Sequence, residues 1–344
     1  MEDQSRQPEL DVGVDIAAAT FTASWLTPAG KPTAAVTMAQ SAQGYATFRE
    51  RLHATGCAPA ATRVVMEATS TYWIALAVSL HEAGYRVFVI NPAQAHYFAK
   101  AQLRRAKTDA LDAQDLARLV GKLDLSAWSP PPAVYHELRQ RLLAREALIA
   151  LRQQARNQRH ALVQWPVIVA SAQRQFDEVI ADLDERIASL DRELALVLTN
   201  GAWAASAAFL TSAPGIGAIT AAWLLVATVN FTLAPSPEAL AAYAGLAPMP
   251  RQSGTSVHGR PSIGHAGNAH LRSALYLAAL SAARYNPAIK PLYDRLRAAG
   301  KPVKVARCAA ARKLLHLAYA LVTKQQAFDP QHRQPKPAEL AAAS

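Results

Sequence analysis

The sequence predicts a multi-domain protein in which an N-terminal α/β domain precedes an all-helical region. At roughly 150 residues per domain, 344 residues correspond to about two domains. Short apolar runs alternate with helical segments in the first third of the chain, whereas helical patterns dominate beyond residue 207. A composition that is 51% hydrophobic and 18% charged is sufficient to bury a core, which excludes general disorder.

The first domain is expected to span residues 8–128. Strands are predicted over residues 10–16, 21–26, 33–38, 63–67 and 86–90, from apolar runs bounded by turn residues. Helices are predicted over residues 44–53, 71–83 and 109–122, and Gly84 is a typical helix stop. A three-stranded beginning followed by strand–helix crossovers is the element order of ribonuclease-H-like nucleases.

Residues 133–200 are predicted to form two long helices after a proline-rich linker at 129–132. Trp165 and Pro166 divide them, since proline disfavours helix in the preceding residue. The second helix carries apolar residues at alternating spacings of four and three, which is a coiled-coil seam: Phe176, Ile180, Leu183, Ile187, Leu190, Leu194 and Val197. A hairpin within the chain and an intermolecular coiled coil would both satisfy this seam.

The third predicted domain, residues 205–327, is helical apart from a loop between Gly245 and Gly267, and residues 328–344 are expected to be a disordered tail. The segment from Leu194 to Pro237 has no charged side chain. Its continuously apolar part is shorter than the roughly 20 residues that a membrane span needs. We therefore expect a buried helix pair and no membrane.

Charge is concentrated in one segment of an otherwise neutral chain. The whole chain has a net charge of +11, and residues 251–316 hold twelve lysines and arginines but a single acid, Asp294, which gives the same value. A neutral body with one strongly basic segment predicts a local site for a polyanion. A solvated basic face is the alternative.

Four carboxylates predict a metal site in the first domain. Asp15 lies in the first predicted strand, Glu67 ends the fourth, and Asp109 and Asp112 are three residues apart on one helix face. Carboxylates that converge repel one another unless a hard cation lies among them, and Mg²⁺ prefers such oxygen ligands. Asp109 and Asp112 would otherwise serve the helix start with Thr108 as N-cap, and Asp115 is expected to be a solvated neighbour.

The basic, glycine-containing loop at residues 250–262 holds a candidate nucleophile, Ser253. Arg251, Gln252 and Arg260 lie close to it in sequence and are candidates for holding phosphate, with His258 a possible general base. A serine hydroxyl attacks a phosphodiester only if its proton is removed and the phosphate charge is neutralised. Serines in such loops are more often turn residues, and Thr255 and Ser256 compete with Ser253.

Two further segments are expected to contact nucleic-acid backbone. Gly215 and Gly217 match the hairpin of a helix-hairpin-helix unit, whose glycines let a phosphate approach unpaired helix N–H groups. A tight turn between core helices is the alternative for them. Asn268, His270 and Arg272 open a later helix and carry groups that can reach phosphate.

A series of short motifs resembles the DEDD transposases of the insertion-sequence 110 family. They are GVDI at 13–16, MEA at 66–68, NP at 91–92, AKTDALDA at 106–113, PGIG at 214–217, YAGLAP at 243–248, QSG at 252–254 and GN at 267–268. The resemblance covers residues 10 to 325, roughly. Members of this family are known as bridge-RNA-guided recombinases.

The resemblance implies a RuvC-like N-terminal domain whose acids, here Asp15, Glu67, Asp109 and Asp112, bind Mg²⁺. It implies a C-terminal transposase domain with a serine nucleophile, to which Ser253 corresponds. It also implies donor and target DNA, a structured noncoding guide RNA, and a homo-oligomer, a dimer that becomes a tetramer when DNA ends are paired. If base pairing reads the sequence, the protein itself needs only positive charge to hold nucleic acid, and the basic segment provides it.

Two other functions are compatible with the residues alone. A metal-dependent junction nuclease would hydrolyse DNA with the acids and leave Ser253 as a loop residue. A non-catalytic nucleic-acid-binding protein would keep only a degenerate nuclease fold. Two cysteines are too few for a disulfide framework, and the polar first residues predict no signal peptide. A cytoplasmic protein is therefore expected, and the resemblance implies that it is bacterial and nucleoid-associated.

Overall fold

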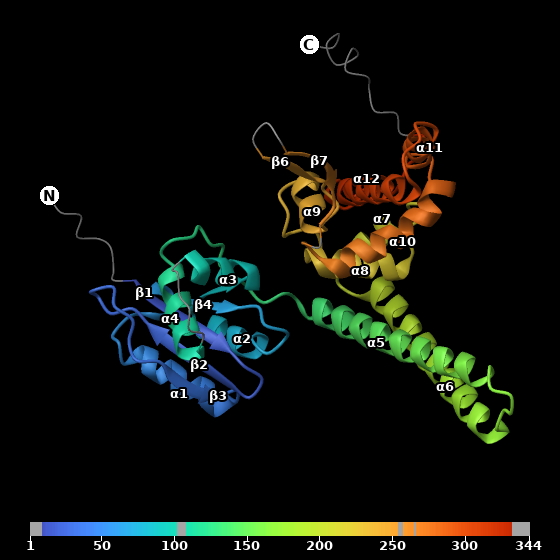
Figure 1. Ribbon diagram of the computed structural model, residues 1–344. Helices are drawn as coiled ribbons and strands as arrows, with labels where there is room; N and C mark the ends of the chain where they lie inside the picture. The colour runs from blue at the N-terminus through green and yellow to red at the C-terminus, as the bar shows by residue number, and fades with distance from the viewer. Residues whose placement is uncertain (1–8, 102–107, 254–256, 265, 332–344) are drawn as a thin grey trace, which may run out of the picture. The chain divides into compact units, whose positions relative to one another are not determined.

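The computed structural model of the protein describes residues 9–101, 108–253, 257–264 and 266–331, with the backbone alone for 250–253 and 257–262. The chain divides into two compact units, Met1–Pro130 and Pro131–Ser344 (Figure 1). The division falls within the proline-rich linker predicted at residues 129–132. The second unit contains both the predicted helix pair at 133–200 and the predicted third domain at 205–327, whereas residues 332–344, most of the predicted tail, lie outside the described residues.

The first unit has the predicted element order. Its elements are β1 (Leu10–Ile16), β2 (Thr20–Trp25), β3 (Val36–Ala39), α1 (Ala42–His53), a short 3₁₀ helix (Pro59–Ala61), β4 (Thr62–Glu67), α2 (Ile74–Glu82), β5 (Arg86–Ile90), α3 (Pro92–Ala101) and α4 (Asp109–Leu119). The sheet order is β3-β2-β1-β4-β5. The first three strands pair antiparallel, and β1, β4 and β5 pair parallel. The prediction of an α/β domain is confirmed.

Helices cover both faces of this sheet (Figure 1). Residues on one face of β1 and β4, such as Val14 and Met66, form a core with Phe48 of α1 and Leu76 of α2. The opposite face packs against α4 through a smaller cluster that includes Val65. Because side chains alternate along a strand, Asp15 and Glu67 lie on the α4 face.

The second unit is helical except for one hairpin. Its elements are α5 (Ala133–Leu162), α6 (Ala170–Asn200), α7 (Ala204–Thr211), α8 (Ala218–Thr228), α9 (Pro237–Tyr243), β6 (Met249–Ser253), β7 (Val257–Ser262), α10 (Ala269–Tyr285), α11 (Lys290–Ala298) and α12 (Val303–Thr323). The strands β6 and β7 correct the expectation of an irregular loop between Gly245 and Gly267. These strands lack alternating apolar residues, so their pairing through the backbone has no signature in the hydrophobic pattern.

The helices α5 and α6 form an antiparallel hairpin within the chain, here called the arm (Figure 1). Arginines of α5 pair with acids of α6 in the order that two antiparallel helices require. The pairs are Arg141 with Glu193, Arg145 with Asp191, Arg152 with Asp184 and Arg159 with Asp177. Among the predicted seam residues, Leu183, Ile187 and Leu194 are buried. The acids of α6 offset the charge of five of the six arginines on α5.

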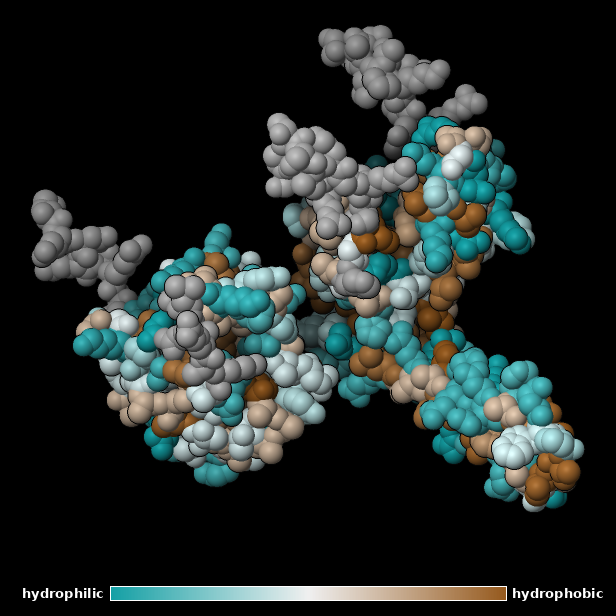
Figure 2. Space-filling view, viewed as in Figure 1, coloured by the Kyte–Doolittle hydropathy of each residue, from teal (hydrophilic) through white to brown (hydrophobic). Residues whose placement is uncertain are grey.

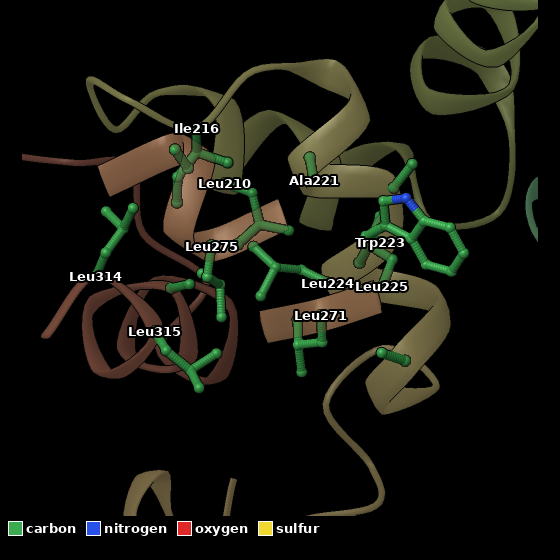
Figure 3. Packing of buried hydrophobic residues seen from close by; sticks show 14 of the residues in the cluster. Leu210, Ile216, Ala221, Trp223, Leu224, Leu225, Leu271, Leu275, Leu314 and Leu315 are labelled. Atoms are coloured by element: carbon green, nitrogen blue, oxygen red, sulfur yellow. The ribbon is translucent and has the colours of Figure 1, made fainter. Parts of the chain in front are cut away.

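A single hydrophobic core holds the base of the arm and the remaining helices together. Leu142 of α5 contributes to it, and α8 contributes seven of its eleven residues, including Trp223 and Leu224. Leu271 and Leu275 of α10 and Leu315 of α12 pack against them (Figure 3). Within the uncharged segment, α8 therefore lies mainly in the core of this unit, as predicted, whereas α7 buries only Ala207 and Leu210.

The far end of the arm is exposed and apolar (Figure 2). Trp165 is 68% exposed and Val167 is 79% exposed where α5 turns into α6. In the part of the chain that the structure describes, no single helix meets the length and apolarity needed to cross a membrane; α6 and α7, which are sharply bent at their junction, meet these criteria only as a pair.

Candidate functional site

Asp15 and Glu67 lie side by side where two parallel strands end. The register pairs Val14 of β1 with Met66 of β4, so the residues that follow them, Asp15 and Glu67, are also adjacent. Both side chains lie on the face that α4 covers. The Glu67 carboxylate accepts a hydrogen bond of 3.3 Å from the Thr69 hydroxyl, a contact that no sequence motif indicated.

Gly13 allows α4 to approach the sheet beside these two acids. A β-carbon added to Gly13 would lie 2.1 Å from the carbonyl oxygen of Ala113 and 2.3 Å from the amide nitrogen of Ala117. No larger residue fits this distance, so the helix backbone rests on the strand. Since Gly13 precedes Asp15 by two residues, the close approach brings the start of α4 near the carboxylates.

The start of α4 carries the other two predicted acids. Thr108 caps this helix as predicted, because its hydroxyl accepts a hydrogen bond of 3.3 Å from the Leu111 amide. Asp109 and Asp112 both lie in the first turn. Their charges also complement the positive end of the helix dipole, so the capping role and a role toward a ligand are compatible.

The four carboxylates interact electrostatically. The pKa of Asp15 is raised from 3.8 to about 6, first by burial and then by repulsion from Asp112, Asp109 and Glu67. Repulsion from all three places them around one region. The arrangement therefore costs free energy at neutral pH unless a positive charge is added.

Oxygen atoms of these acids suit a hard divalent cation such as Mg²⁺. In the described ranges, however, no three histidine, cysteine or acidic side chains are already close enough to hold a metal ion. Charges influence a pKa over longer distances than a coordination bond spans. The side chains would have to rotate inward to share an ion.

The expectation for Asp115 was wrong. It is only 5% exposed, and it forms an ion pair of 3.0 Å with Arg118 three residues further along α4. One turn beyond Asp112 the helix already lies against the sheet, which excludes water from this position. Asp115 is a paired buried acid and not a solvated neighbour.

Ser253 is the last residue of β6, at the far end of the β6–β7 hairpin. Its backbone pairs with Val257, and Gln252 pairs with His258. The side chains of Ser253, Arg251, Gln252 and Arg260 lie outside the described part of the structure, as do Thr255 and Ser256 entirely. Their roles remain predictions, and the backbone places the serine beside the turn of a hairpin.

Two glycines in contact close the base of this hairpin. A β-carbon on Gly267 would lie 2.7 Å from the amide nitrogen of Gly245, and both glycines have positive φ angles of 93° and 68°. Other residues are strained in this left-handed region. The YAGLAP and GN motifs are thus the two ends of one hairpin, joined through their glycines.

The three candidates at the start of α10 contact different neighbours. Asn268 caps the helix by accepting from the Leu271 amide at 3.0 Å, and Arg272 donates to the Ala266 carbonyl at 2.8 Å. His270 lies 2.8 Å from a carboxylate oxygen of Glu146 and stacks on Trp223. Each of these side chains thus has a contact within the protein. Their contact with nucleic acid stays a prediction.

The two glycines between α7 and α8 have different environments. A β-carbon on Gly215, whose φ is 104°, would lie 2.6 Å from that of Ala282 on α10, so packing requires this glycine. The nearby Pro214 carbonyl accepts a hydrogen bond of 2.9 Å from Asn286. A β-carbon on Gly217, which starts α8, would meet no atom within 4 Å. Packing does not require Gly217, which is the N-cap of α8, and phosphate binding by its backbone stays a prediction.

Comparisons with known proteins match both units. A transposase family model for the DEDD transposases of IS110 matches residues 12–165, and one for the IS116/IS110/IS902 transposases matches residues 207–294. The first match includes all four acids, and the second includes the serine hairpin. The fold and these matches define the class of the protein: it is a transposase, an enzyme of DNA transposition and recombination.

Relatives over the whole length identify the family. The chain is 33% identical to the pilin gene-inverting protein of Moraxella bovis over 92% of this chain and 97% of that protein. A shorter match is 40% identical to a 43.6 kDa insertion element IS110 protein of Streptomyces coelicolor, over 39% of this chain and 32% of that protein. The chain belongs to the IS110 family of transposases.

Proposed function

We propose that this transposase is RNA-guided and exchanges DNA strands through a covalent serine intermediate. The carboxylate cluster is the observation that carries the proposal. Burial, and then repulsion from three acids, raises the pKa of Asp15, and protein folds retain such a cost mainly where a function requires it. Ser253, at the end of the hairpin that the two glycines close, is the nucleophile in this proposal, which the family resemblance supports.

The chemistry of the proposed step balances without a nucleotide cofactor. The Ser253 Oγ atom attacks a phosphodiester, an Oγ–P bond forms, the P–O3′ bond breaks, and the serine proton passes to the departing 3′ oxygen. The freed 3′ hydroxyl then attacks the phosphoserine of the partner strand and reverses this step on a new DNA end. The bond energy is conserved in the covalent link.

Asp15, Glu67, Asp109 and Asp112 would hold Mg²⁺ in a RuvC-like domain. Bound there, the ion supplies positive charge that neutralises phosphate oxygens as the bond breaks. The acids keep that charge in place, and Thr69 orients the Glu67 carboxylate by its hydrogen bond.

Phosphate contacts are proposed for the helical basic surface as well as the hairpin. Arg284, Arg295, Lys301, Lys304 and Lys313 are exposed, and in the described part of this segment the acid Asp294 already pairs with Lys290. The excess positive charge therefore faces solvent, as backbone binding requires. Guide RNA and DNA are both proposed partners for it, within a dimeric or tetrameric assembly.

The name of the Moraxella relative favours recombination over the alternative of a junction nuclease. A protein that inverts a gene must cut both DNA strands and rejoin them in the opposite orientation, whereas hydrolysis alone leaves ends unjoined. A relative over the whole length whose name describes inversion therefore supports strand exchange for this chain.

The serine step is tested with the intact insertion element on a plasmid in cells, where excised and rejoined DNA is measured by quantitative PCR. Ser253→Ala is expected to abolish rejoined product and covalent protein–DNA adduct. Ser262→Ala, in the same hairpin, is the matched control and should retain both. Cleavage without rejoining by Ser253→Ala would instead establish hydrolysis, and rejoining by it would refute the mechanism.

Guidance by RNA is tested separately. The protein is purified from cells that carry the whole element, and the RNA bound to it is sequenced. One discrete noncoding RNA from the element is expected. Random fragments of cellular RNA would contradict guidance without affecting the serine step.

A further inference from the structure

The first turn of α10 contacts three separate parts of the second unit. His270 is two residues from both Asn268 and Arg272, and helix positions i and i+2 do not face each other, whereas Asn268 and Arg272 are four residues apart and share a face. All three side chains therefore cannot converge on one phosphate group. Each instead contacts a different neighbour, so this turn is a junction.

Two of these contacts hold the ends of the serine hairpin. The Asn268 side chain donates a hydrogen bond of 3.1 Å to the Tyr243 hydroxyl, and its backbone amide donates one of 2.7 Å to the Tyr243 carbonyl. Arg272 donates to Ala266, near the other end. A rotation or shift of α10 would therefore move both ends of the hairpin that carries Ser253.

The third contact holds the arm. His270 Nδ1 lies 2.8 Å from Glu146 Oε2 on α5, and the imidazole stacks on the buried indole of Trp223 with ring centroids 4.6 Å apart and planes at 9°. Glu146 lies one turn beyond Leu142, the last fully buried residue of α5 in this core. His270 thus connects α10 to the arm just where the arm leaves the core.

We propose that the first turn of α10 couples the arm to the hairpin, with His270 as a positioning residue that sets the placement of Ser253. The inference rests on the proposed function, because it concerns the same serine. The His270 and Glu146 side chains are 47% and 41% exposed, so their pair contributes little to folding. The pair instead affects where α10 and the hairpin lie, and a nucleophilic attack requires an accurately placed serine.

The test compares Glu146→Gln, His270→Phe and the double variant in the intact-element assay. Phenylalanine keeps a ring on Trp223 but loses the contact with Glu146. Glu193→Gln is the matched control, since it breaks a similar exposed ion pair with Arg141 on the same arm without touching α10. Ser253→Ala and the wild type are measured in parallel, together with melting temperature and affinity for a random-sequence DNA duplex.

Both single variants are expected to lower rejoined product by about tenfold to about 100-fold, because a displacement of ~1 Å can cost that much. The double variant should be no worse than either single variant. Melting temperature and duplex affinity should stay unchanged, and Glu193→Gln should match the wild type.

Three results would overturn the coupling. One is wild-type activity in both single variants. Another is reduced duplex affinity in His270→Phe with no effect of Glu146→Gln, which would make His270 a phosphate contact. The third is an equal loss in Glu193→Gln. If Ser253→Ala remains active, the proposed function fails instead, so the two failures are distinguishable.

Discussion

Replacing Asp15 with asparagine is expected to stabilise the N-terminal unit in the absence of divalent cations. The Asp15 pKa is raised to about 6 from 3.8 by burial and by its acidic neighbours. The folded state therefore binds this proton more tightly than the unfolded chain does. The resulting stability is fully present below about pH 4 and is lost as the pH rises through about 6.

The magnitude follows from the shift in pKa. A difference of about two pKa units corresponds to ~3 kcal/mol at about 1.4 kcal/mol per unit. From the two pKa values, nearly all of this loss of folding stability applies at pH 8 and about half of it applies at pH 5. Partial exposure of the side chain screens the charge, so Asp15→Asn should raise the free energy of unfolding by about 1–3 kcal/mol at pH 8.

Hydrogen–deuterium exchange of peptides that cover β1 and β4 measures this stability in the first unit by itself. Asp11→Asn is the matched control in the same strand, because Asp11 pairs with Arg63 through contacts of 2.7 and 3.0 Å. Removing that paired charge should destabilise the unit. The same chemical change at two positions of β1 is thus expected to have opposite signs.

Magnesium should stabilise the wild type selectively. At a concentration of 100 times its dissociation constant, an ion that binds only the folded state adds about 2.7 kcal/mol. We expect this gain in the wild type and not in Asp15→Asn. A neutral or destabilising effect of Asp15→Asn at pH 8 without metal would refute the reasoning, as would an equal gain from Mg²⁺ in both proteins.

Three further predictions concern the second unit. Gly215→Ala should destabilise it by about 1–3 kcal/mol in thermal melts because of the contact with Ala282 and the positive φ, whereas Gly217→Ala should melt as the wild type does but bind duplex DNA less tightly. The pKa of His316 is lowered mainly by burial, so the unfolded state binds the proton first and stability falls as the pH drops below about 6.5. His316→Leu should reduce this loss of stability in melts between pH 7 and 5. An unchanged pH dependence of the melting temperature would contradict the prediction. If about eight bases of the 251–316 segment touch phosphates, log K should fall against log salt with a slope of roughly −6 to −7, while a slope near −1 would indicate a solvated face.

The strands and helices of the first unit could be predicted because their residues carry the signal locally. The apolar alternation in β1 and the cap at Thr108 belong to residues adjacent in sequence. The four acids could be proposed as candidates for the same reason, since a carboxylate in an apolar strand and an i, i+3 pair of acids are both visible in the sequence. The burial of Asp115 was missed because it depends on how closely α4 approaches the sheet, which Gly13 decides from a distant part of the chain.

The choice between an intramolecular and an intermolecular seam illustrates the same limit. The apolar spacing of α6 was readable, but a seam is equally satisfied by any complementary helix. The ion pairs between α5 and α6 settle the choice in favour of a hairpin. Local periodicity determines that a face is apolar, and only packing determines what covers it.

The sequence by itself determined the family, the element order of the first unit, the four acids and the serine as candidates, and the location of the excess charge. These follow from residue types, periodicity and motifs, which act over a few positions. Only the tertiary contacts show that burial and three acidic neighbours raise the pKa of Asp15, that two glycines join the ends of the hairpin, and that His270 contacts Glu146. Those contacts join residues far apart in the chain, and their distances exist only once the elements have packed.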